Sequence, residues 1–370
     1  MPPATASVQA PSVAVVHDYL NQCGGAERVA LELTRTWPGA PLYTSLYRPS
    51  STFSEFAQLD VRVSPLDRLP VDEHFRALAP LYPAAFRAFG ELSEDVVISS
   101  SSGWAHGVRT ARGSLHVVYC HTPARWLYRR QEHLGRAVGP VLLGPLLGSL
   151  RRWDRAAARR ADVYVATSEW VRRRIAAVYG RDSEIVPPPI DVDRFSPRPR
   201  GDRLLVVSRL IPWKRVDLVV RAATRAGLAL DVLGDGPMLN DLRAAAGSTV
   251  AFHPPDERKT VELLESCRAL IVAGTEDFGM TALEANAAGK PVVSHASGGA
   301  LETVRDGVTG ALFTALTEEA VVDAIERADG IDAAPQELAA HARLFSAGVF
   351  RERMRQLVVA HLASSRSSVS

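Results

Sequence analysis

The chain has 370 residues, of which 46% are hydrophobic and 23% are charged, and its formal net charge is +2. This length predicts two or three domains that each bury a core, and the balanced charge gives no support for a nucleic-acid partner. Three widely spaced cysteines (Cys23, Cys120 and Cys267) argue against a disulfide framework, and no CxxC pair suggests zinc. The sequence therefore predicts a cytoplasmic protein.

The N-terminal twelve residues are rich in Pro, Ala and Ser and carry no positive charge ahead of an apolar segment. We expect a disordered lead-in there and no secretory signal. The longest apolar stretch, 137–150, is about 14 residues long and is interrupted by glycine and proline. A spanning helix needs roughly 20 apolar residues, so the sequence predicts no membrane-spanning segment.

Short β-branched runs alternate with longer helical patterns along the chain, which is typical of parallel sheets flanked by helices. In the first half, strands are expected at 13–17, 96–99, 116–120 and 162–167. In the second half, they are expected at 204–208, 229–233, 249–252, 269–272 and 291–294. The pattern predicts an α/β protein of two Rossmann-like domains, whose ligands bind beyond the carboxyl ends of the strands.

A charged segment that contains Pro and Gly, Ser196–Asp202, separates the two sets of strands and is typical of a linker. The expected organisation is an N-terminal domain over 13–197 and a C-terminal domain over 198–344, facing each other across a cleft. The remaining parts are the lead-in 1–12, a C-terminal helix over 345–363 and a disordered tail over 364–370.

The first predicted strand is followed by a loop that contains Gly24 and Gly25, directly ahead of a helical pattern. Paired glycines let a backbone approach a phosphate or a sugar closely, and a helix N-terminus adds a positive field. The alternative is a plain turn in which glycine serves the backbone conformation and Glu27 orders the loop. We favour a phosphate or acceptor role for the glycines.

His121 follows the predicted strand 116–120 and precedes Thr122 and Pro123, which indicate a turn at the edge of the sheet. Its ring can hydrogen-bond a sugar hydroxyl at that edge. It can equally be a core histidine that is already satisfied or a residue that caps the turn. His17 and His106 are weaker candidates of the same kind.

Arg209 and Lys214 come directly after the predicted strand 204–208 and lie five residues apart. A guanidinium fork and an ammonium together neutralise the concentrated charge of a diphosphate well. The plain alternative is a solvated basic loop. After the next strand, Gly234 and Gly236 permit a tight turn.

Glu276 and Glu284 flank a turn of small residues ahead of an apolar helical pattern. The backbone N–H groups of Gly279, Met280 and Thr281 would be orphan donors at the helix N-terminus, which is a ready anion site. One glutamate can bind sugar hydroxyls and the other a ribose diol. The alternative is a chance pair of solvated glutamates.

Taken together, the segments 17–28, 121–128, 208–217 and 276–284 resemble the retaining glycosyltransferases of family 4, which have the GT-B fold. The resemblance covers nearly the whole chain and is closest to bacterial mannosyltransferase-like members of surface-polysaccharide or glycolipid pathways. It implies an N-terminal acceptor domain, a C-terminal nucleotide-sugar donor domain, and a C-terminal helix that returns to the N-terminal domain.

The resemblance also implies the reaction, which is metal-independent transfer of a mannose-like or glucose-like hexose from a nucleotide diphosphate sugar to a hydroxyl, with retention. The acceptor stays open among a glycan, a lipid-linked molecule and a small molecule. Neither a cofactor nor a metal is expected. The implied catalytic residues are Arg209, Lys214, Glu276 and His121. The implied donor-binding residues are Gly24, Gly25, Gly234, Gly236, Phe278, Gly279, Met280, Thr281 and Glu284.

Two segments depart from the family pattern and leave the donor open. Pro187-Pro188-Pro189 stands where many members have Pro-Asn-Gly, and Phe252-His253-Pro254 stands where a glycine commonly follows. Two other functions also stay open on the same fold, a nucleotide-sugar epimerase and a non-catalytic nucleotide-sugar binding protein. An epimerase needs acid and base carboxylates near the sugar, and the Arg209–Lys214 pair argues against it.

Arginines recur in the segment 151–160, after the interrupted apolar stretch. A basic helix with an apolar flank can lie on anionic lipid, whereas a basic face that only meets water is the plain alternative. Because many family members use lipid-linked acceptors, we favour a weak peripheral contact with the inner face of the membrane.

Overall fold

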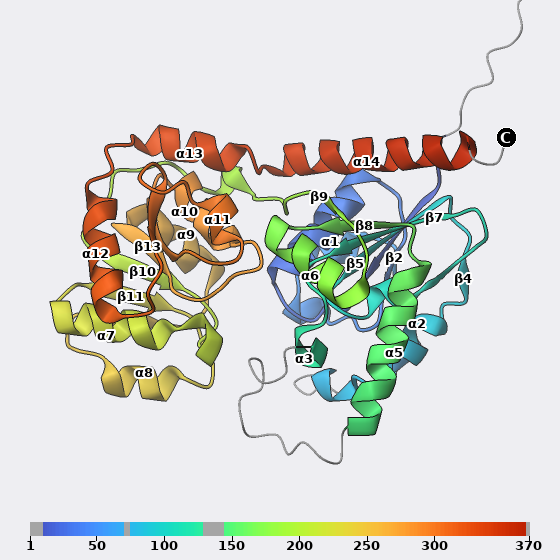
Figure 1. The fold of residues 1–370 in the computed structure, drawn as a ribbon, viewed down its shortest axis with the longest axis horizontal. Coiled ribbons are helices and arrows are strands. Elements are labelled where there is room, and N and C mark those ends of the chain that lie inside the picture. The colour runs from blue at the N-terminus through green and yellow to red at the C-terminus, as the bar shows by residue number, and fades with distance from the viewer. Residues whose placement is uncertain (1–9, 70–74, 129–143, 368–370) are drawn as a thin grey trace, which may run out of the picture. The chain divides into compact units, whose positions relative to one another are not determined.

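The computed structural model describes residues 10–69, 75–128 and 144–367. The chain divides into two compact units (Figure 1). The first unit comprises residues 1–167, 171–186 and 351–370, and the second comprises 168–170 and 187–350.

A parallel sheet forms the centre of the first unit. Among the described residues it has seven strands, in the order β3-β2-β1-β5-β7-β8-β9. Their bounds are β1 Val13–His17, β2 Leu42–Thr44, β3 Val61–Val63, β5 Val96–Ser101, β7 Leu115–Cys120, β8 Val163–Ala166 and β9 Glu184–Ile185. A separate pair joins β4 Glu91–Leu92 to β6 Arg109–Thr110. Because β1 lies between β2 and β5, the strand order reverses there, and the switch point lies at the carboxyl ends of β1 and β5.

Helices cover the sheet of the first unit. They are α1 Gly25–Thr36, α2 Tyr82–Arg87, α3 Arg125–Tyr128, α5 Gly144–Arg160 and α6 Glu169–Tyr179, with α14 Ala347–Ser367 passing into this unit at its residue 351. In α5, Leu150, Asp154, Ala157 and Ala158 recur at helical spacing and are buried, so one face of this helix packs inward. The Trp104 ring beside it stacks on Tyr82 and Trp126, with centroids 5.0 and 4.8 Å away.

The second unit is built around another parallel sheet. Six strands of the described chain form it, in the order β12-β11-β10-β13-β14-β15. Their bounds are β10 Leu204–Val207, β11 Leu230–Leu233, β12 Val250–His253, β13 Ala269–Val272, β14 Val292–His295 and β15 Gly310–Phe313. Here β10 lies between β11 and β13, so the switch point of this sheet lies at the carboxyl ends of β10 and β13.

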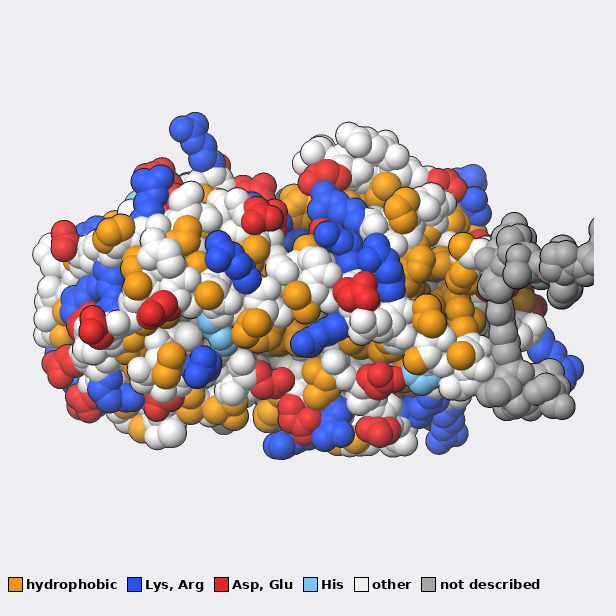
Figure 2. Space-filling model, turned by 90° about the horizontal axis from the view of Figure 1, so that it is seen from above, with side chains coloured by type: hydrophobic (Ala, Val, Ile, Leu, Met, Phe, Trp, Pro, Cys, Tyr) orange, Lys and Arg blue, Asp and Glu red, His pale blue; other side chains and the backbone are white. Residues whose placement is uncertain are grey.

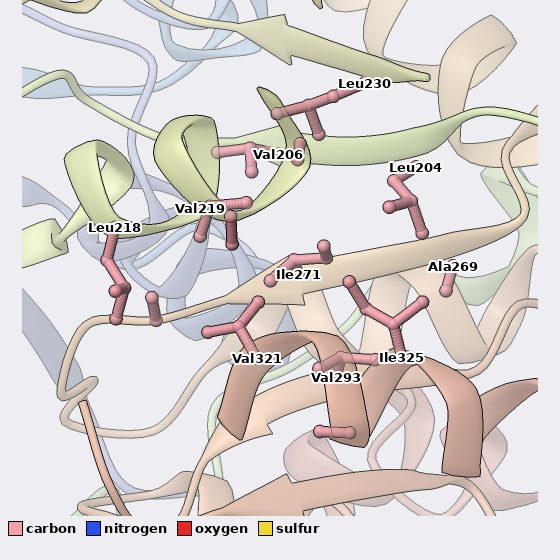
Figure 3. Close-up of a cluster of buried hydrophobic side chains, with 14 of the residues drawn as sticks. Leu204, Val206, Leu218, Val219, Leu230, Ala269, Ile271, Val293, Val321 and Ile325 are labelled. Carbon is pink, nitrogen blue, oxygen red and sulfur yellow. The ribbon is translucent and has the colours of Figure 1, made fainter. Parts of the chain in front are cut away.

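The helices of the second unit are α7 Val216–Ala226, α8 Leu239–Ala245, α9 Glu257–Ser266, α10 Met280–Ala287, α11 Ala300–Thr303, α12 Glu318–Asp329 and α13 Pro335–Arg343. Figure 3 shows α7 and α12 packing their apolar side chains onto β10 and β13. In α12, Val321 and Ile325 are four residues apart and buried, so both face the sheet. Burial of each such side chain contributes about 1.5–3 kcal/mol. Helices α9 and α10 cover the opposite face.

The nine strands predicted from the sequence are confirmed, with ends displaced by no more than two residues. Within the described residues, the sequence patterns missed six strands: β2, β3, β4, β6, β9 and β15. Five of these have three residues or fewer, which is too short for periodicity to separate a strand from a turn. The sixth, β15, has the sequence Gly-Ala-Leu-Phe and lacks the β-branched residues that indicate a strand. The predicted α/β architecture of two Rossmann-like units agrees with the two parallel sheets.

The segment Ser196–Asp202, predicted to be a linker, is docked on the second unit. The buried Lys290 ammonium donates to the carbonyl oxygens of Arg198 and Pro199 at 2.8 and 2.5 Å, and Arg200 donates to the Ile331 carbonyl. A buried ammonium needs such partners, and this requirement holds the segment in place. Apart from the short segment 168–170, the chain passes between the units at 186–187 and 350–351, whereas the sequence placed the boundaries at 197–198 and 344–345.

The predicted disordered ends lie largely outside the described residues, which begin at 10 and end at 367. Helix α14 reaches Ser367, so residues 364–367 are helical where a disordered tail was expected from 364. The Ser364 hydroxyl donates to the carbonyl oxygen of Ala360 at 3.0 Å, as serine does in a helix.

In the part of the apolar stretch 137–150 that the structure describes, α5 begins at Gly144. None of the described helices is both long and apolar enough to cross a membrane. On the face shown in Figure 2, basic, acidic and apolar side chains are interspersed.

Candidate active site

An ion pair joins the two loops at the switch point of the second unit. Lys214 ends the short helix Pro212–Lys214 after β10, and its ammonium donates to a carboxylate oxygen of Glu276, which follows β13. The two side chains are 14% and 23% exposed. Because β10 and β13 are neighbouring parallel strands, the loops leave the same edge of the sheet. The structure thus brings together two residues predicted to be catalytic.

Arg209 stands in the same loop as Lys214. Its guanidinium lies over the ring of Trp213, 5.9 Å from the centroid, a contact that orients the cation. Leu210 N–H donates to the carbonyl oxygen of Asp235 at 2.8 Å, and Met238 N–H donates to that of Leu210 at 3.1 Å. These bonds fix the loop of Arg209 against the turn after β11.

Gly234 and Gly236, predicted to bind the donor, occupy this turn after β11. A Cβ on Gly234 would lie 1.8 Å from the carbonyl oxygen of Ser208, and one on Gly236 would lie 2.5 Å from that of Leu210. Both glycines also have positive φ angles, 157° and 153°. The structure therefore gives each a packing role beside the Arg209 loop, and their contact with a nucleotide stays a prediction.

Gly274, which was not predicted from the sequence, determines how closely the loops of Lys214 and Glu276 approach each other. A Cβ at this position would lie 2.7 Å from Lys214 Cα and 2.7 Å from the carbonyl oxygen of Trp213. Any side chain would therefore push the Lys214 backbone away from the loop that carries Glu276. The only signal in the sequence is a glycine two residues before that glutamate.

Gly298 and Gly299 pack against the backbone of Glu276 and Phe278. Gly299 N–H donates to the carbonyl oxygen of Glu276 at 2.9 Å. A Cβ on Gly298 would lie 2.1 Å from that oxygen, and one on Gly299 would lie 2.3 Å from the Phe278 backbone. The sequence patterns gave no sign that these two glycines contact the loop of Glu276.

Hydroxyl groups hold the residue next to Glu276. Thr275 Oγ1 lies 2.8 Å from Ser297 Oγ, and Ser297 Oγ lies 2.7 Å from His295 Nδ1. The loop after β14 thus supports the loop after β13 through side chains as well as through backbone bonds.

Helix α10 begins as the sequence predicts, with Gly279 as its N-terminal cap at a φ of 96°. Met280 and Thr281 occupy its first turn, and Glu284 lies on its second turn, half-buried. The N–H groups of Met280 and Thr281 are therefore at the positive end of the helix. Phe278 is 5% exposed and packs with Ile190 and Leu283, so its side chain anchors the loop in the core.

His121 belongs to the first unit, where it follows β7. Its Nε2 lies 2.8 Å from Ser100 Oγ, and that hydroxyl lies 3.0 Å from Nδ1 of His17. Burial, and next the neighbouring His17, lower the pKa of His121 to about 3. The ring is therefore neutral at physiological pH.

Asp18 closes the same edge of the first sheet. Its carboxylate accepts from the backbone N–H groups of Ser102, Trp104 and Ala105 at 2.6, 3.0 and 2.7 Å. It is 3% exposed. Asp18 therefore has a structural role, because it holds the chain after β5 against the end of β1.

Gly24 caps α1, and Gly25 is the first residue of that helix. A Cβ on Gly24 would lie 2.5 Å from Oε2 of Glu27, a side chain that is 1% exposed and accepts from the Gln22 amide at 2.9 Å. Glu27 thus orders the loop, which is the alternative that the sequence left open. The phosphate or acceptor role of the two glycines stays a prediction.

His106, the other weak candidate, is tied into the core of the first unit. Its Nε2 lies 3.2 Å from Oδ1 of the buried Asp154 on α5, and its Nδ1 lies 3.1 Å from Ser101 Oγ.

The predicted site residues fall into one group in each unit. Over the residues that the structure describes, there is no group of three or more His, Cys, Asp or Glu that could hold a metal ion.

Two family models match consecutive parts of the chain. The model described as "Glycosyltransferase Family 4" matches residues 23–194. The model described as "Glycosyl transferases group 1" matches residues 191–343. The two matches together take in every residue of the second-unit site described above.

Several relatives match part of the chain. This chain is 34% identical over 225 residues to a GDP-mannose-dependent alpha-(1-6)-phosphatidylinositol monomannoside mannosyltransferase of Mycolicibacterium smegmatis. The match covers 52% of this chain and 58% of that protein. The chain is 36% identical over 200 residues to a D-inositol 3-phosphate glycosyltransferase of Geodermatophilus obscurus, covering 41% and 42%. The chain thus spans about half the length of the curated relatives it matches.

Solved structures match nearly the whole chain at low identity. One is Anabaena HepE in complex with UDP and glucose, with a TM-score of 0.72, 18% identity, and coverage of 95% of this chain and 100% of that one. Another is a sucrose-phosphate synthase from Thermosynechococcus elongatus, with a TM-score of 0.71, 17% identity, and coverage of 96% and 100%. At such identities the likeness establishes the fold alone.

Proposed function

Because the chain belongs to glycosyltransferase family 4 and has the GT-B fold predicted from its sequence, we propose that it transfers a hexose from a nucleotide diphosphate sugar to an acceptor hydroxyl, with retention. The hexose is mannose-like or glucose-like. The acceptor belongs to a glycan, a lipid-linked molecule or a small molecule.

The observation that carries the proposal is the Lys214–Glu276 ion pair at the switch point of the second sheet. Open parallel sheets bind ligands at this place. A diphosphate gives the Lys214 ammonium a more highly charged partner than a carboxylate. When the donor binds, Lys214 moves to the phosphates, and Glu276 is released to accept hydrogen bonds from the hexose hydroxyls.

The remaining donor groups follow from the same arrangement. Arg209, oriented by Trp213, supplies a fork that can bind two phosphate oxygens. The N–H groups of Met280 and Thr281, at the start of α10, add a positive field for the diphosphate. Glu284 binds the ribose diol. With these cations in place, the reaction needs no metal to neutralise the leaving diphosphate.

Retention requires that the acceptor attack on the face that the diphosphate leaves. In the proposed mechanism an oxygen of the leaving phosphate takes the proton of the acceptor hydroxyl. Arg209 and Lys214 stabilise the charge that develops on the phosphate, a kind of interaction that acts mainly in the transition state. Glu276 holds the hexose while its anomeric carbon becomes cationic.

The names of the relatives guide the choice of donor. One relative is named for its dependence on GDP-mannose, and one neighbour of the same fold holds UDP and glucose. We therefore propose a GDP- or UDP-hexose and test both with an ADP-hexose beside them. A ligand at 100 times its dissociation constant stabilises a protein by about 2.7 kcal/mol, which a melting curve resolves easily.

The test has two stages. The donor that raises the melting temperature is incubated with candidate acceptors, and the anomeric configuration of the first product is read by NMR. The proposal predicts a glycoside with the configuration of the donor. An isomerised nucleotide sugar formed without any acceptor would favour an epimerase, and binding with no product from any acceptor would favour a non-catalytic binding protein.

A lipid-linked acceptor would place α5 near a membrane. Arg152, Arg155 and Arg159 of this helix are exposed, and each cation close to an anionic surface is worth roughly 1 kcal/mol. We propose a weak peripheral contact through this face. Flotation with phosphatidylserine vesicles at low salt should carry the protein, and glutamate at the three positions should abolish this. If the protein does not float with the vesicles at low salt, the result would favour a soluble acceptor.

A further inference from the structure

Four polar side chains form a continuous chain in the first unit, from α1 to the residue after β7. His17 Nε2 lies 3.8 Å from Oε1 of Glu27. His17 Nδ1 lies 3.0 Å from Ser100 Oγ, which lies 2.8 Å from His121 Nε2. Glu27, His17 and Ser100 are between 0% and 2% exposed, so water does not compete for the two hydrogen bonds of Ser100 or screen the contact between His17 and Glu27.

The serine hydroxyl can connect the two rings in either of two directions. A hydroxyl has one hydrogen to donate and can accept two hydrogen bonds. In one direction, His121 donates through Nε2–H to Ser100, which donates to His17 Nδ1. In the other, His17 donates through Nδ1–H, Ser100 donates to His121 Nε2, and His121 carries its proton on Nδ1. The two directions thus give opposite tautomers of His121.

The carboxylate of Glu27 distinguishes the two directions. If His17 carried its proton on Nδ1, the lone pair of Nε2 would face the carboxylate at 3.8 Å in a buried site. With the proton on Nε2, a positive N–H edge faces the negative charge, and Nδ1 is left to accept from Ser100. Gly24 supports the arrangement, because its missing side chain leaves the space that Glu27 Oε2 occupies.

We propose that Glu27, His17 and Ser100 are positioning residues that fix His121 in the tautomer with the proton on Nε2 and a free acceptor at Nδ1. The inference rests on the proposed function for its substrate, a hexose or acceptor hydroxyl that donates to Nδ1. The neutral state that it requires agrees with the pKa of about 3 that burial and His17 give His121.

The tautomer of His121 determines which substrate groups this side chain can bind. An unprotonated ring nitrogen accepts from hydroxyl groups but cannot bond to the oxygens of a phosphate, which are themselves acceptors. His121 therefore selects a hydroxyl-bearing part of the substrate and leaves the diphosphate to the cations. The opposite tautomer would favour phosphate.

The tautomer can be measured without any substrate. Protein labelled with ¹⁵N in its histidines gives long-range ¹H–¹⁵N spectra in which protonated and unprotonated ring nitrogens are well separated, and the His121→Gln variant assigns the His121 signals. We expect Nε2 to be protonated and Nδ1 to be unprotonated in the wild type at pH 7.5. A His121 protonated on Nδ1 would overturn the proposal.

Two variants test how the tautomer is fixed. Glu27→Gln removes the charge while keeping the shape, and Ser100→Ala removes the connection, so both should give a mixture of the two His121 tautomers. Glu32→Gln is the matched control, because Glu32 is a buried glutamate of the same helix that pairs with Arg35 and Arg351 instead. An unchanged His121 spectrum in both Glu27→Gln and Ser100→Ala would show that the chain does not set the tautomer.

Kinetics separate this inference from the proposed function. A mixture leaves part of the protein in the productive tautomer, and an even mixture lowers kcat/KM about twofold, because the apparent affinity falls with the competent fraction. We expect a loss of about twofold in Glu27→Gln and none in Glu32→Gln. If the spectra agree with the proposal but no sugar is transferred, the proposed function fails while the control of the tautomer stands. If sugar is transferred but the wild-type tautomer is reversed, only this inference fails.

Discussion

Lys214 donates a hydrogen bond to Glu276 across the edge where β10 and β13 end. The two residues are 62 positions apart in the chain and meet because their strands are neighbours in the sheet. In the proposed reaction they have different partners, the diphosphate and the hexose. The ion pair therefore keeps both side chains at the site until the donor takes its place.

Loss of the Lys214 cation should impair turnover far more than folding. Lys214→Met should lower kcat by about a hundredfold or more, since removal of one group that stabilises developing charge costs roughly 3 kcal/mol. Because the ion pair is partly exposed, the substitution should lower the free energy of unfolding by no more than about 1 kcal/mol. Steady-state kinetics and thermal melting measure the two effects.

Lys259→Met is the matched control, because Lys259 pairs with Glu262 on α9 of the same unit. It should leave both kcat and the melting temperature nearly unchanged. Near-normal turnover of Lys214→Met would remove Lys214 from the mechanism.

Gly274→Ala should damage the site through the backbone. The new Cβ would lie 2.7 Å from Lys214 Cα, so the loop must shift, and such overpacking typically costs 1–3 kcal/mol of stability. We expect kcat to fall more than tenfold because Lys214 moves away from Glu276. Gly330→Ala is the control, since its φ is negative and its new Cβ would meet only an ordinary contact at 3.5 Å. Equal effects of the two substitutions would show that Gly274 has no special position.

The two glutamates should separate in kinetics. Glu284→Gln weakens the contact with the ribose in the ground state and should mainly raise KM for the donor. Glu276→Gln weakens a contact that tightens as the anomeric carbon becomes cationic and should mainly lower kcat. Initial rates over a range of donor concentrations distinguish the two effects. The reverse pattern would exchange the two roles.

Stability should fall in acid because of buried histidines. Burial, and next His106 and Arg160, lower the pKa of His116 to about 3, whereas a histidine in the unfolded chain has a pKa of about 6.5. Between these values the unfolded state binds more protons, so the free energy of unfolding decreases as the pH falls from 6.5 towards 3. His121 contributes in the same direction.

Urea unfolding at pH 7 and pH 5 measures this dependence. The His116→Gln substitution should reduce the difference between the free energies of unfolding at pH 7 and pH 5, because the glutamine takes up no proton on unfolding. An unchanged difference would assign the acid sensitivity to other groups.

The nine confirmed strands and the positions of the candidate site residues at their ends could be predicted because both depend on local patterns. Arg209, Lys214 and Glu276 each follow an apolar run, and a parallel sheet brings the ends of such runs to one edge. The residues that support them could not be found in this way. Gly274 matters only because the Lys214 backbone lies against it, and Gly299 matters only because it bonds to Glu276.

The first unit shows the same limit. Gly24 was interpreted as a glycine with a phosphate or acceptor role, which stays a prediction. Its packing role could not be predicted, because the Glu27 carboxylate lies where a side chain on Gly24 would be only in the folded chain. Ser100, which connects His17 to His121, lies in a strand whose Val and Ser residues are all buried. No pattern in that strand separates a serine that packs from one that connects two rings.

The most direct test of the account is a calorimetric titration with the GDP- or UDP-hexose that stabilises the protein, performed in EDTA. We predict that the wild type and Lys259→Met bind the donor equally well without metal. Lys214→Met should bind it at least tenfold more weakly, because a charged hydrogen bond to the diphosphate is worth about 1.5–3 kcal/mol. Binding that vanished in EDTA and returned with Mg²⁺, or equal affinity in Lys214→Met, would contradict a donor site built on Lys214.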